Sequence, residues 1–375
     1  MKTAFLYTDA LARFDYGESH PLKTVRLKLT YELTRSYGLL SLPQCRLIEP
    51  KMATDEDLLK FHEEGYLEVL KEVNSGVMVF GAEQYGLGPG DNPVFRGLYD
   101  WSRLVTGASL QAASLVESGE VDAAFSISGG LHHARASSAS GFCYVNDPVI
   151  AIHSLLEKGR RVLYIDLDAH HGDGVQDAFY ATDRVLTVSV HETGSGLFPG
   201  TGFEDETGAG KGRGYSVNVP MPPYSDDELF LYAFDEIVPP LFDLFRPDVV
   251  VSQLGVDSFQ SDPLAHLNYT TNGFGEAVRR IHELSPKWVA LGGGGYDVAN
   301  VARAWTLAWA IMNGVGIPDE IPAEFLERYR SAGFEGGRLR DGAYVEEGAG
   351  KEQRREEVKR VVRVVKETIF PALGK

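Results

Sequence analysis

The chain has 375 residues, of which 36 are basic and 53 acidic, so its formal net charge at pH 7 is −17. This charge argues against a nucleic-acid partner, because nucleic-acid binding needs a basic face that displaces cations from phosphates. It favours solubility and would attract a basic substrate. No apolar run approaches the roughly 18 residues of a membrane helix, and the N-terminal segment lacks the apolar core of a signal peptide. Two cysteines so far apart in sequence cannot form a disulfide framework. We therefore expect a cytoplasmic protein without a membrane partner.

Strand-like and helix-like segments alternate along the chain. Short apolar runs rich in β-branched residues indicate buried strands, at 3–7, 123–127, 162–166, 185–190, 248–253 and 287–291. Longer segments between them have helical patterns, at 102–118, 147–158, 226–245 and 272–284. Because strands alternate with helices, the chain is predicted to be α/β, with a central parallel sheet and helices on both faces.

The chain is expected to fold as one domain over residues 1–375. Its Gly-rich stretches lie between apolar segments and are predicted to be loops of that domain, at 81–90, 194–214 and 292–295. The C-terminal segment 345–375 is predicted to form a helix that packs against the body. Its apolar residues recur at helical spacing along 351–370, at Val358, Val361, Val362, Val365 and Ile369.

Titratable or aromatic side chains follow five of the predicted strands. In chain order they are His132 and His133; Asp166, Asp168, His170, His171 and Asp173; His191 and Phe198; Asp257; and Tyr296, which follows four glycines. Ligands of open parallel α/β sheets bind outside the carboxyl ends of the strands. These residues are therefore expected to converge on one rim of the sheet.

The segment 166–174 (DLDAHHGDG) carries the strongest local signal. Alternate residues of an extended chain point the same way, so Asp168 and His170 can converge on one metal ion. Asp257, at the end of another strand, is the candidate for a third ligand. Three protein ligands leave a coordination position open, as in catalytic sites; Zn²⁺ suits this set, and Fe²⁺ or Co²⁺ could also bind. The alternative is that these carboxylates only cap helices and bind loop amides.

The tandem histidines are candidates for a general acid/base pair. His132 and His133 would each need a carboxylate to fix the tautomer, and Asp166 and Asp173 lie in the right neighbourhood. The alternative for each is a buried, hydrogen-bonded core histidine.

Tyr296 could donate a hydrogen bond to a developing oxyanion. The alternative function of the four preceding glycines is a nucleotide-binding loop, but the G-x-G-x-x-G spacing of such loops is absent.

Nine segments together resemble the histone deacetylase superfamily, and especially its bacterial acetoin-utilisation type. They span about 14–310, the motif-bearing core: HPLKTVR (20–26), GDNPVF (90–95), SGGLHHA (128–134), ASGFCYVND (139–147), VLYIDLDAHHGDGVQDAFY (162–180), VSVHETGSGLFPGTG (188–202), GKGRGYSVNVP (210–220), QLGVDSFQSDPLAHL (253–267) and LGGGGYD (291–297). The resemblance implies an arginase-like single-domain fold. It also implies metal-dependent removal of the acetyl group from acetylated lysine in proteins or peptides, with release of acetate.

The resemblance also implies roles for individual residues. Zn²⁺, or alternatively Fe²⁺, would be bound by Asp168, His170 and Asp257. The proton-transfer pairs would be His132 with Asp166 and His133 with Asp173, and Tyr296 would polarise the acetyl carbonyl. Residues that contact the substrate would be Gly141, Phe142, Phe198 and Leu264, which form an apolar tunnel, together with Gly294 and with Asp91 at the rim. Acetate would leave through a channel at Arg26.

Structural K⁺ would occupy two further sites by the same resemblance. The first would use Asp166, Asp168, His170, Ser189 and Val190, and the second Phe179, Thr182, Val185 and Tyr215.

Two other functions stay open from the sequence. One is deacetylation of a small molecule such as an acetylpolyamine, since HETG and DPLAHL are closer to the acetoin-utilisation type than to nuclear enzymes. The other is a non-catalytic module that binds acyl-lysine or metal, for which proton-transfer pairs would serve no purpose. No G-x-S-x-G nucleophile motif is present, so no covalent acyl-enzyme is expected. The sequence carries no signal for an oligomeric state.

Overall fold

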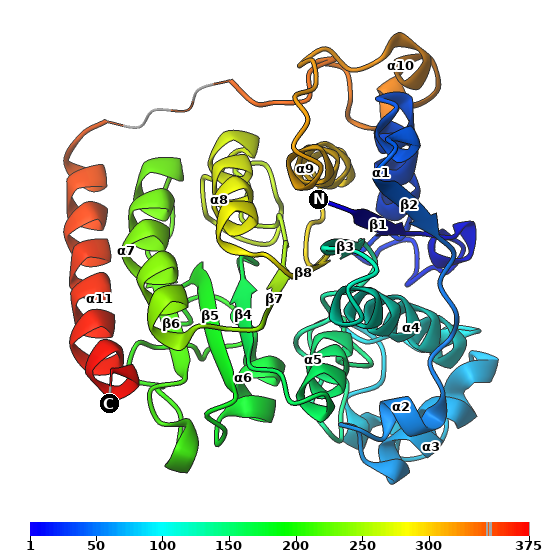
Figure 1. Cartoon of the computed structure of the whole chain (residues 1–375). Coiled ribbons are helices and arrows are strands. Elements are labelled where there is room, and N and C mark those ends of the chain that lie inside the picture. Colours follow the sequence, from blue (N-terminus) through cyan, green and yellow to red (C-terminus); the bar gives the residue numbers. More distant parts are fainter. Residues whose placement is uncertain (343, 345–346, 375) are drawn as a thin grey trace.

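A computed structural model describes residues 1–342, 344 and 347–374 of the chain. Within them, eight strands form one parallel sheet in the order β2-β1-β3-β8-β7-β4-β5-β6 (Figure 1). The strands are β1 (Thr3–Leu6), β2 (Cys45–Ile48), β3 (Ala123–Ser126), β4 (Val162–Asp166), β5 (Val185–Glu192), β6 (Ser216–Met221), β7 (Val249–Gln253) and β8 (Trp288–Leu291). The predicted α/β class with a parallel sheet is confirmed.

Helices lie on both faces of the sheet (Figure 1). They are α1 (Val25–Ser36), α2 (Asp55–Leu58), α3 (Glu64–Glu72), α4 (Leu98–Glu117), α5 (Asp147–Glu157), α6 (Asp173–Phe179), α7 (Asp227–Phe245), α8 (Thr271–Leu284), α9 (Val298–Met312), α10 (Ala323–Tyr329) and α11 (Ala349–Leu373). Among the described residues, no helix has both the length and the apolar character needed to cross a membrane.

Alternate residues of a central strand pack into different apolar clusters. Val162 and Tyr164 of β4 belong to a cluster that includes residues of α4 and α5, such as Ile152. Leu163 of the same strand belongs to the cluster that includes Trp305 of α9. Because side chains alternate along a strand, this division means that both faces of the sheet are buried.

The six predicted strands are all present, with ends that differ by at most two residues. The prediction missed β2 and β6, the two strands at the edges of the sheet. The strand β2 has only four residues, all at least partly exposed, and β6 contains Pro220, which a central strand would not tolerate. Neither segment therefore has the continuous apolar run that identified the buried strands.

The C-terminal helix α11 packs beside α7 and against β6 (Figure 1). Residues 345, 346 and 375 of the predicted segment 345–375 lie outside the described residues. The five apolar residues predicted to face the body are all buried. Lys351 joins the start of α11 to the start of α7, since its Nζ lies 2.7 Å from carboxylate oxygens of both Asp226 and Glu228.

The packing of α11 predicts the effect of truncating one of its buried side chains. Ile369→Ala should lower the free energy of unfolding by about 2–5 kcal/mol, because it leaves a cavity against the body. The exposed Glu367 on the same helix supplies a control, and Glu367→Ala should change this free energy by less than about 0.5 kcal/mol. Urea unfolding monitored by circular dichroism measures both. Equal unfolding midpoints for Ile369→Ala and the wild type would contradict the packing of α11.

Candidate active site

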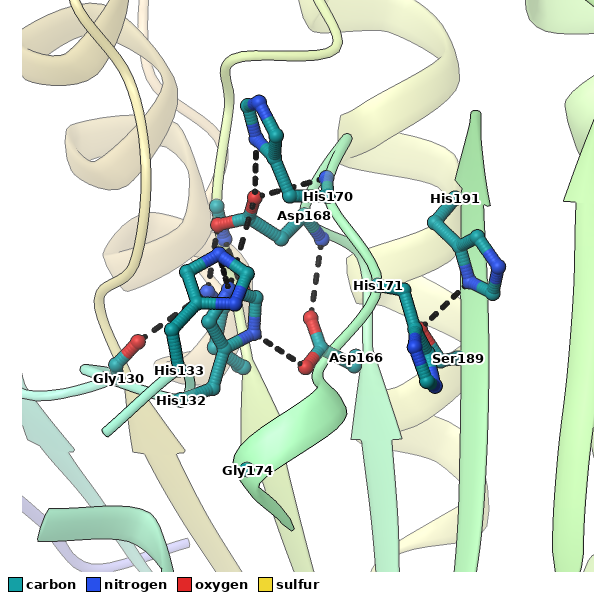
Figure 2. A network of polar contacts seen from close by, with 12 residues as sticks. Gly130, His132, His133, Asp166, Asp168, His170, His171, Gly174, Ser189 and His191 are labelled. Carbon is teal, nitrogen blue, oxygen red and sulfur yellow. Dashed lines mark hydrogen bonds and ion pairs between the residues drawn. The ribbon is translucent and has the colours of Figure 1, made fainter. Parts of the chain in front are cut away.

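Three potential metal ligands meet at the carboxyl ends of β4 and β7. One ligand atom from each of Asp168, His170 and Asp257 lies within 4.8 Å of the others, and all three residues are buried. His170 Nδ1 lies 2.9 Å from Asp257 Oδ2 and 3.2 Å from Asp168 Oδ1. Figure 2 shows Asp168 and His170 on the segment that follows β4. The predicted convergence of these three residues is therefore present in the fold.

Neighbouring groups orient the two carboxylates. Asp168 Oδ2 accepts hydrogen bonds from Gln253 Nε2 at 2.6 Å and from the Gly294 backbone N–H at 2.7 Å. Asp257 Oδ1 accepts a hydrogen bond from the Ala169 backbone N–H at 2.8 Å. The other oxygen of each carboxylate is thereby turned toward His170.

The chemistry of this donor set fits a divalent cation. Burial and the neighbouring Asp168 carboxylate raise the pKa of Asp257, because two negative charges are unfavourable so close together without water. A bound cation would offset this repulsion and hold both carboxylates ionised. One nitrogen and two carboxylate oxygens, with room for a further ligand, are typical of a catalytic metal site.

Beside the three ligands, two histidines each form a contact with a carboxylate, of which Figure 2 shows that between His132 and Asp166. His132 Nδ1 lies 2.8 Å from Asp166 Oδ2, and His133 Nδ1 lies 2.7 Å from Asp173 Oδ1. Each Nδ1 therefore carries its hydrogen toward a carboxylate, which leaves Nε2 to act in the site. The two Nε2 atoms lie 3.0 Å apart, close enough to share one proton.

The electrostatic surroundings of the two imidazoles differ. Burial opposes protonation of His132, but Asp166 and Asp168 outweigh it and raise its pKa to about 9. Burial and the neighbouring His132 lower the pKa of His133 to about 4, despite the attraction of Asp173. The surrounding carboxylates therefore favour protonation of His132 more than protonation of His133.

The turn that carries the histidines is fixed by residues that the sequence analysis did not assign. Asp147 accepts hydrogen bonds from the Gly130 and Leu131 backbone N–H groups, at 3.1 and 2.9 Å. Asn146 Nδ2 donates to the carbonyl oxygens on either side of His133, those of His132 and Ala134. The signal available in the sequence was an Asn-Asp pair at the start of a helix, which by itself predicts only a cap. Figure 2 shows Gly130 beside the histidines.

Arg135 was also missed. Its Nη2 donates to Asp173 Oδ2 at 2.6 Å, whereas His133 contacts Asp173 Oδ1. Arg135 therefore helps to orient the carboxylate that holds His133.

A cavity of about 210 Å³ leads from the surface to the ligands and histidines. It is lined by Asp91, His133, Gly141, Phe142, His170, Leu197, Phe198, Leu264 and Tyr296. Asp91 is exposed, and the Phe198 ring, 44% exposed, lies 5.0 Å from the His133 ring. The four predicted tunnel residues and Asp91 all line the cavity, and Leu197 was not predicted. Gly294, also predicted to contact the substrate, lies in the inner cavity beside Asp257.

A second, smaller cavity lies behind the first. Its lining includes Arg26, Cys143, Gly294 and Tyr296. Arg26 is buried, donates from Nη1 to the Gly295 carbonyl at 2.9 Å, and stacks 5.3 Å from the centre of the Trp305 ring. The predicted channel residue thus lies on the inner side of the site.

Tyr296 lies between the two cavities and lines both. Burial raises the pKa of Tyr296 above its ordinary value, so its hydroxyl stays protonated and able to donate. Its backbone N–H donates to Asp262 Oδ2 at 2.7 Å, and Asp262 Oδ1 accepts from the Leu264 backbone N–H at 3.0 Å. Asp262, another residue not predicted, therefore fixes Tyr296 relative to a wall residue of the cavity.

The residues predicted for K⁺ lie along β4, β5 and the segments beside them. Asp166 is opposite Ser189 in the register of β4 and β5, and Val190 follows on β5. The Thr182 backbone N–H donates to the Phe179 carbonyl at 3.2 Å, and the Tyr215 carbonyl accepts from the Thr187 backbone N–H at 3.0 Å. Val185 begins β5.

Comparisons with known proteins agree with this geometry. The histone deacetylase domain matches residues 20–312. The chain is 42% identical over 336 residues to histone deacetylase B of Dictyostelium discoideum, covering 89% of this chain and 79% of that protein. It is 40% identical over 336 residues to the acetoin utilization protein AcuC of Bacillus subtilis (strain 168), covering 88% of this chain and 86% of that protein.

The solved structures that resemble this chain are also of histone deacetylase homologues. A histone deacetylase homologue from Aquifex aeolicus superimposes with a TM-score of 0.90 at 36% identity, over 98% of this chain and all of that one. A histone deacetylase homologue complexed with SAHA gives a TM-score of 0.90 at 35% identity, over 98% of this chain and 100% of that chain. Both coverages extend over the site.

The three-ligand cluster predicts how metal affinity responds to substitution. Substitution of a residue that only hydrogen-bonds to a metal ligand typically lowers metal affinity by about 10–100-fold. Asp257→Asn replaces a charged ligand itself and should therefore weaken Zn²⁺ binding by about 100-fold or more. Competition with a chromophoric chelator measures this affinity without reference to any reaction. Asp243→Asn, an exposed change on α7, should bind Zn²⁺ like the wild type. An unchanged affinity in Asp257→Asn would show that the ion binds elsewhere.

Proposed function

The chain belongs to the histone deacetylase family and is a deacetylase, and we propose that it acts on acetylated lysine in proteins or peptides with zinc as its metal. The observation that carries this proposal is the lining of the first cavity. Phe142 and Phe198 line it together with the exposed Asp91, and it reaches His170, one of the three clustered ligands. Aromatic walls suit the apolar methylene stem of acetyl-lysine, whose amide must reach the inner end.

Zinc held by Asp168, His170 and Asp257 would lower the pKa of a water molecule and polarise the acetyl carbonyl. The histidine pair supplies the proton transfers of the reaction. The pair takes one proton from the water as its oxygen attacks the acetyl carbon, and it delivers one proton to the lysine nitrogen as the C–N bond breaks. The products are acetate and a free amine, and no covalent intermediate with the protein is required.

We assign the delivery of the proton to His133. This histidine lines the cavity through which the lysine enters, whereas His132 lines only the inner cavity. The contact between the two Nε2 atoms allows a proton taken up at one ring to reach the other. Asp166 and Asp173 keep both rings in the tautomer that presents Nε2 to the substrate.

Tyr296 donates a hydrogen bond to the oxyanion that develops from the acetyl carbonyl. Its hydroxyl belongs to a half-buried ring whose centre lies 5.6 Å from that of Phe142, and the ring lines both the outer and the inner cavity. A donor fixed in a site without water stabilises developing charge more than a mobile one in solution.

We further propose that the chain folds as a single domain, binds structural K⁺ at the two sets of residues named above, and acts in the cytoplasm. One continuous sheet joins strands from the first 50 residues to strands near residue 290, which supports a single domain. Cys45 and Cys143 are both free thiols, which suits a reducing compartment.

A small acetylated amine such as an acetylpolyamine is the second candidate substrate. The net charge of −17 favours it, because a negative field attracts a polycation. A peptide is favoured by Asp91, whose carboxylate at the mouth can accept charge-assisted hydrogen bonds from backbone N–H groups.

The role of Tyr296 predicts a selective loss of turnover. Tyr296→Phe should lower kcat by roughly 10²–10³, the usual effect of removing one oxyanion donor. Zinc content and melting temperature should stay at their wild-type values, since only a hydroxyl is removed. Tyr232→Phe, an exposed change on α7, should leave kcat unaltered. Steady-state assays on an acetyl-lysine peptide give the answer, and a Tyr296→Phe enzyme with normal kcat would remove this tyrosine from the mechanism.

The role of Asp91 predicts a change in selectivity. In the wild type, kcat/KM should be higher for an acetyl-lysine peptide than for an acetylpolyamine. Asp91→Ala should lower kcat/KM for the peptide by roughly 10-fold, because it removes the acceptor of the backbone N–H groups, whereas the polyamine value should fall only by the smaller effect of losing one negative charge. Asp243→Ala serves as the matched control for loss of one negative charge. A wild-type preference for the polyamine, or an equal loss for both substrates, would favour the small-molecule function.

A further inference from the structure

His20 joins three segments at the mouth of the cavity. It is 7% exposed, and its Nε2 lies 3.2 Å from the carbonyl oxygen of Asp91. Its ring packs edge-on against Phe142, with ring centres 4.5 Å apart. One side chain from the N-terminal segment therefore contacts both the rim residue and a wall residue of the cavity, which lie far away in sequence.

The hydrogen bonds of His20 define its tautomer. The Leu22 backbone N–H donates to Nδ1 at 3.1 Å, so Nδ1 carries no hydrogen and the ring hydrogen is on Nε2. Nε2 can therefore donate to the Asp91 carbonyl. Burial lowers the pKa of His20, which favours the neutral ring with this arrangement.

The loop that carries Asp91 is anchored at its base and exposed at its tip. Gly86, Gly88 and Gly90 have positive φ angles, Leu87 and Asn92 are buried, and residues 89–91 are exposed. The Gly88 backbone N–H donates to the Asn92 carbonyl, and Asn92 Nδ2 donates to the Gly86 carbonyl, both at 3.0 Å. These two bonds close the loop on itself. The bond from His20 is what ties residue 91 to the wall of the cavity.

His20 also contacts Phe142, whose backbone conformation is unusual. Phe142 has a φ of 68°, a left-handed conformation that surrounding contacts must maintain in a residue other than glycine. The Tyr16 hydroxyl donates to the Phe142 carbonyl at 2.9 Å, and the Tyr16 and His20 rings lie 4.8 Å apart. The segment from Tyr16 to His20 thus supports the wall and the rim together.

We infer that His20 is a positioning residue that determines the preference for peptide-borne acetyl-lysine, by fixing Asp91 at the distance from Phe142 that a lysine in an extended backbone requires. This inference rests on the proposed role of Asp91 in binding the peptide backbone. His20 itself touches neither the acetyl group nor the ligand cluster, so it acts on substrate binding and not on the chemical step.

The test compares kinetics of His20→Ala, His20→Gln, Asp91→Ala and the double variant His20→Ala/Asp91→Ala. The substrates are an acetyl-lysine peptide and a monoacetylated diamine, which has no peptide backbone. We expect His20→Ala to raise KM for the peptide roughly fivefold, the effect of losing one hydrogen bond, with kcat within about twofold. KM for the diamine should not change.

Two further comparisons separate positioning from general damage. His20→Gln keeps an N–H donor at a similar reach and should restore KM for the peptide to near the wild-type value. The double variant should resemble Asp91→Ala alone, because two residues that act through one contact are not additive. His282→Ala, a partly buried histidine on α8 remote from the cavity, controls for loss of an imidazole, and melting temperatures are recorded for every variant.

Each failure has a distinct meaning. If Asp91→Ala weakens peptide binding while His20→Ala does not, the proposed function stands and the role of His20 is overturned. If His20→Ala and Asp91→Ala have fully additive effects, or if His20→Ala harms both substrates equally, His20 does not act through Asp91 and the inference is also overturned. If Asp91→Ala has no effect on the peptide, the proposed recognition of the backbone fails, and the inference fails with it.

Discussion

The site depends on the close burial of two carboxylates, Asp168 and Asp257. Burial of an ionised carboxylate away from water costs free energy unless the carboxylate is paired and hydrogen-bonded, and burial of two adjacent carboxylates costs more. The fold meets this constraint partly with donors to the outer oxygens, from Gln253, Gly294 and the Ala169 backbone. The inner oxygens keep an excess of negative charge that His170, His132 at 3.9 Å from Asp168 Oδ1, and a bound cation can balance. Glycine is required at 255 and 294, since an added Cβ would lie 2.3 Å from Asp168 Oδ2 and 2.2 Å from Asp257 Oδ2, respectively.

The two histidines beside the carboxylates must also be hydrogen-bonded, because they are buried. Each imidazole is buried and therefore needs partners on both nitrogens, and the carboxylates that supply them are themselves bonded, Asp166 by the Tyr164 hydroxyl and Asp173 by Arg135. A buried polar network of this kind is stable only when every member is satisfied, and it is then rigid. The proton transfer proposed for the two histidines would require such rigidity. Tyr164 and Arg135 fix the carboxylates that hold the two rings.

The sequence predicted the parts of the molecule that have a local signature. The central strands are continuous runs of β-branched residues, and the titratable residues directly follow them, so the sheet centre and the ligand cluster could be located. The helix α9 was missed because it is apolar almost all round and so lacks a periodic stripe. Asp147, Asp262 and His20 were missed for a different reason. Each bonds backbone groups of a segment far away in sequence, and nothing in its own neighbourhood marks that contact.

The order of the strands has a consequence for how the metal site comes into being. The ligands Asp168 and Asp257 follow β4 and β7, which are neighbours in the sheet although they are distant along the chain. Contacts between distant segments form slowly, and no ligand pocket exists until they have formed. A cation that binds only the folded chain stabilises it by about 2.7 kcal/mol at a free concentration 100 times its Kd. A cation bound by Asp168, His170 and Asp257 would therefore also stabilise the pairing of β4 with β7 in the middle of the sheet.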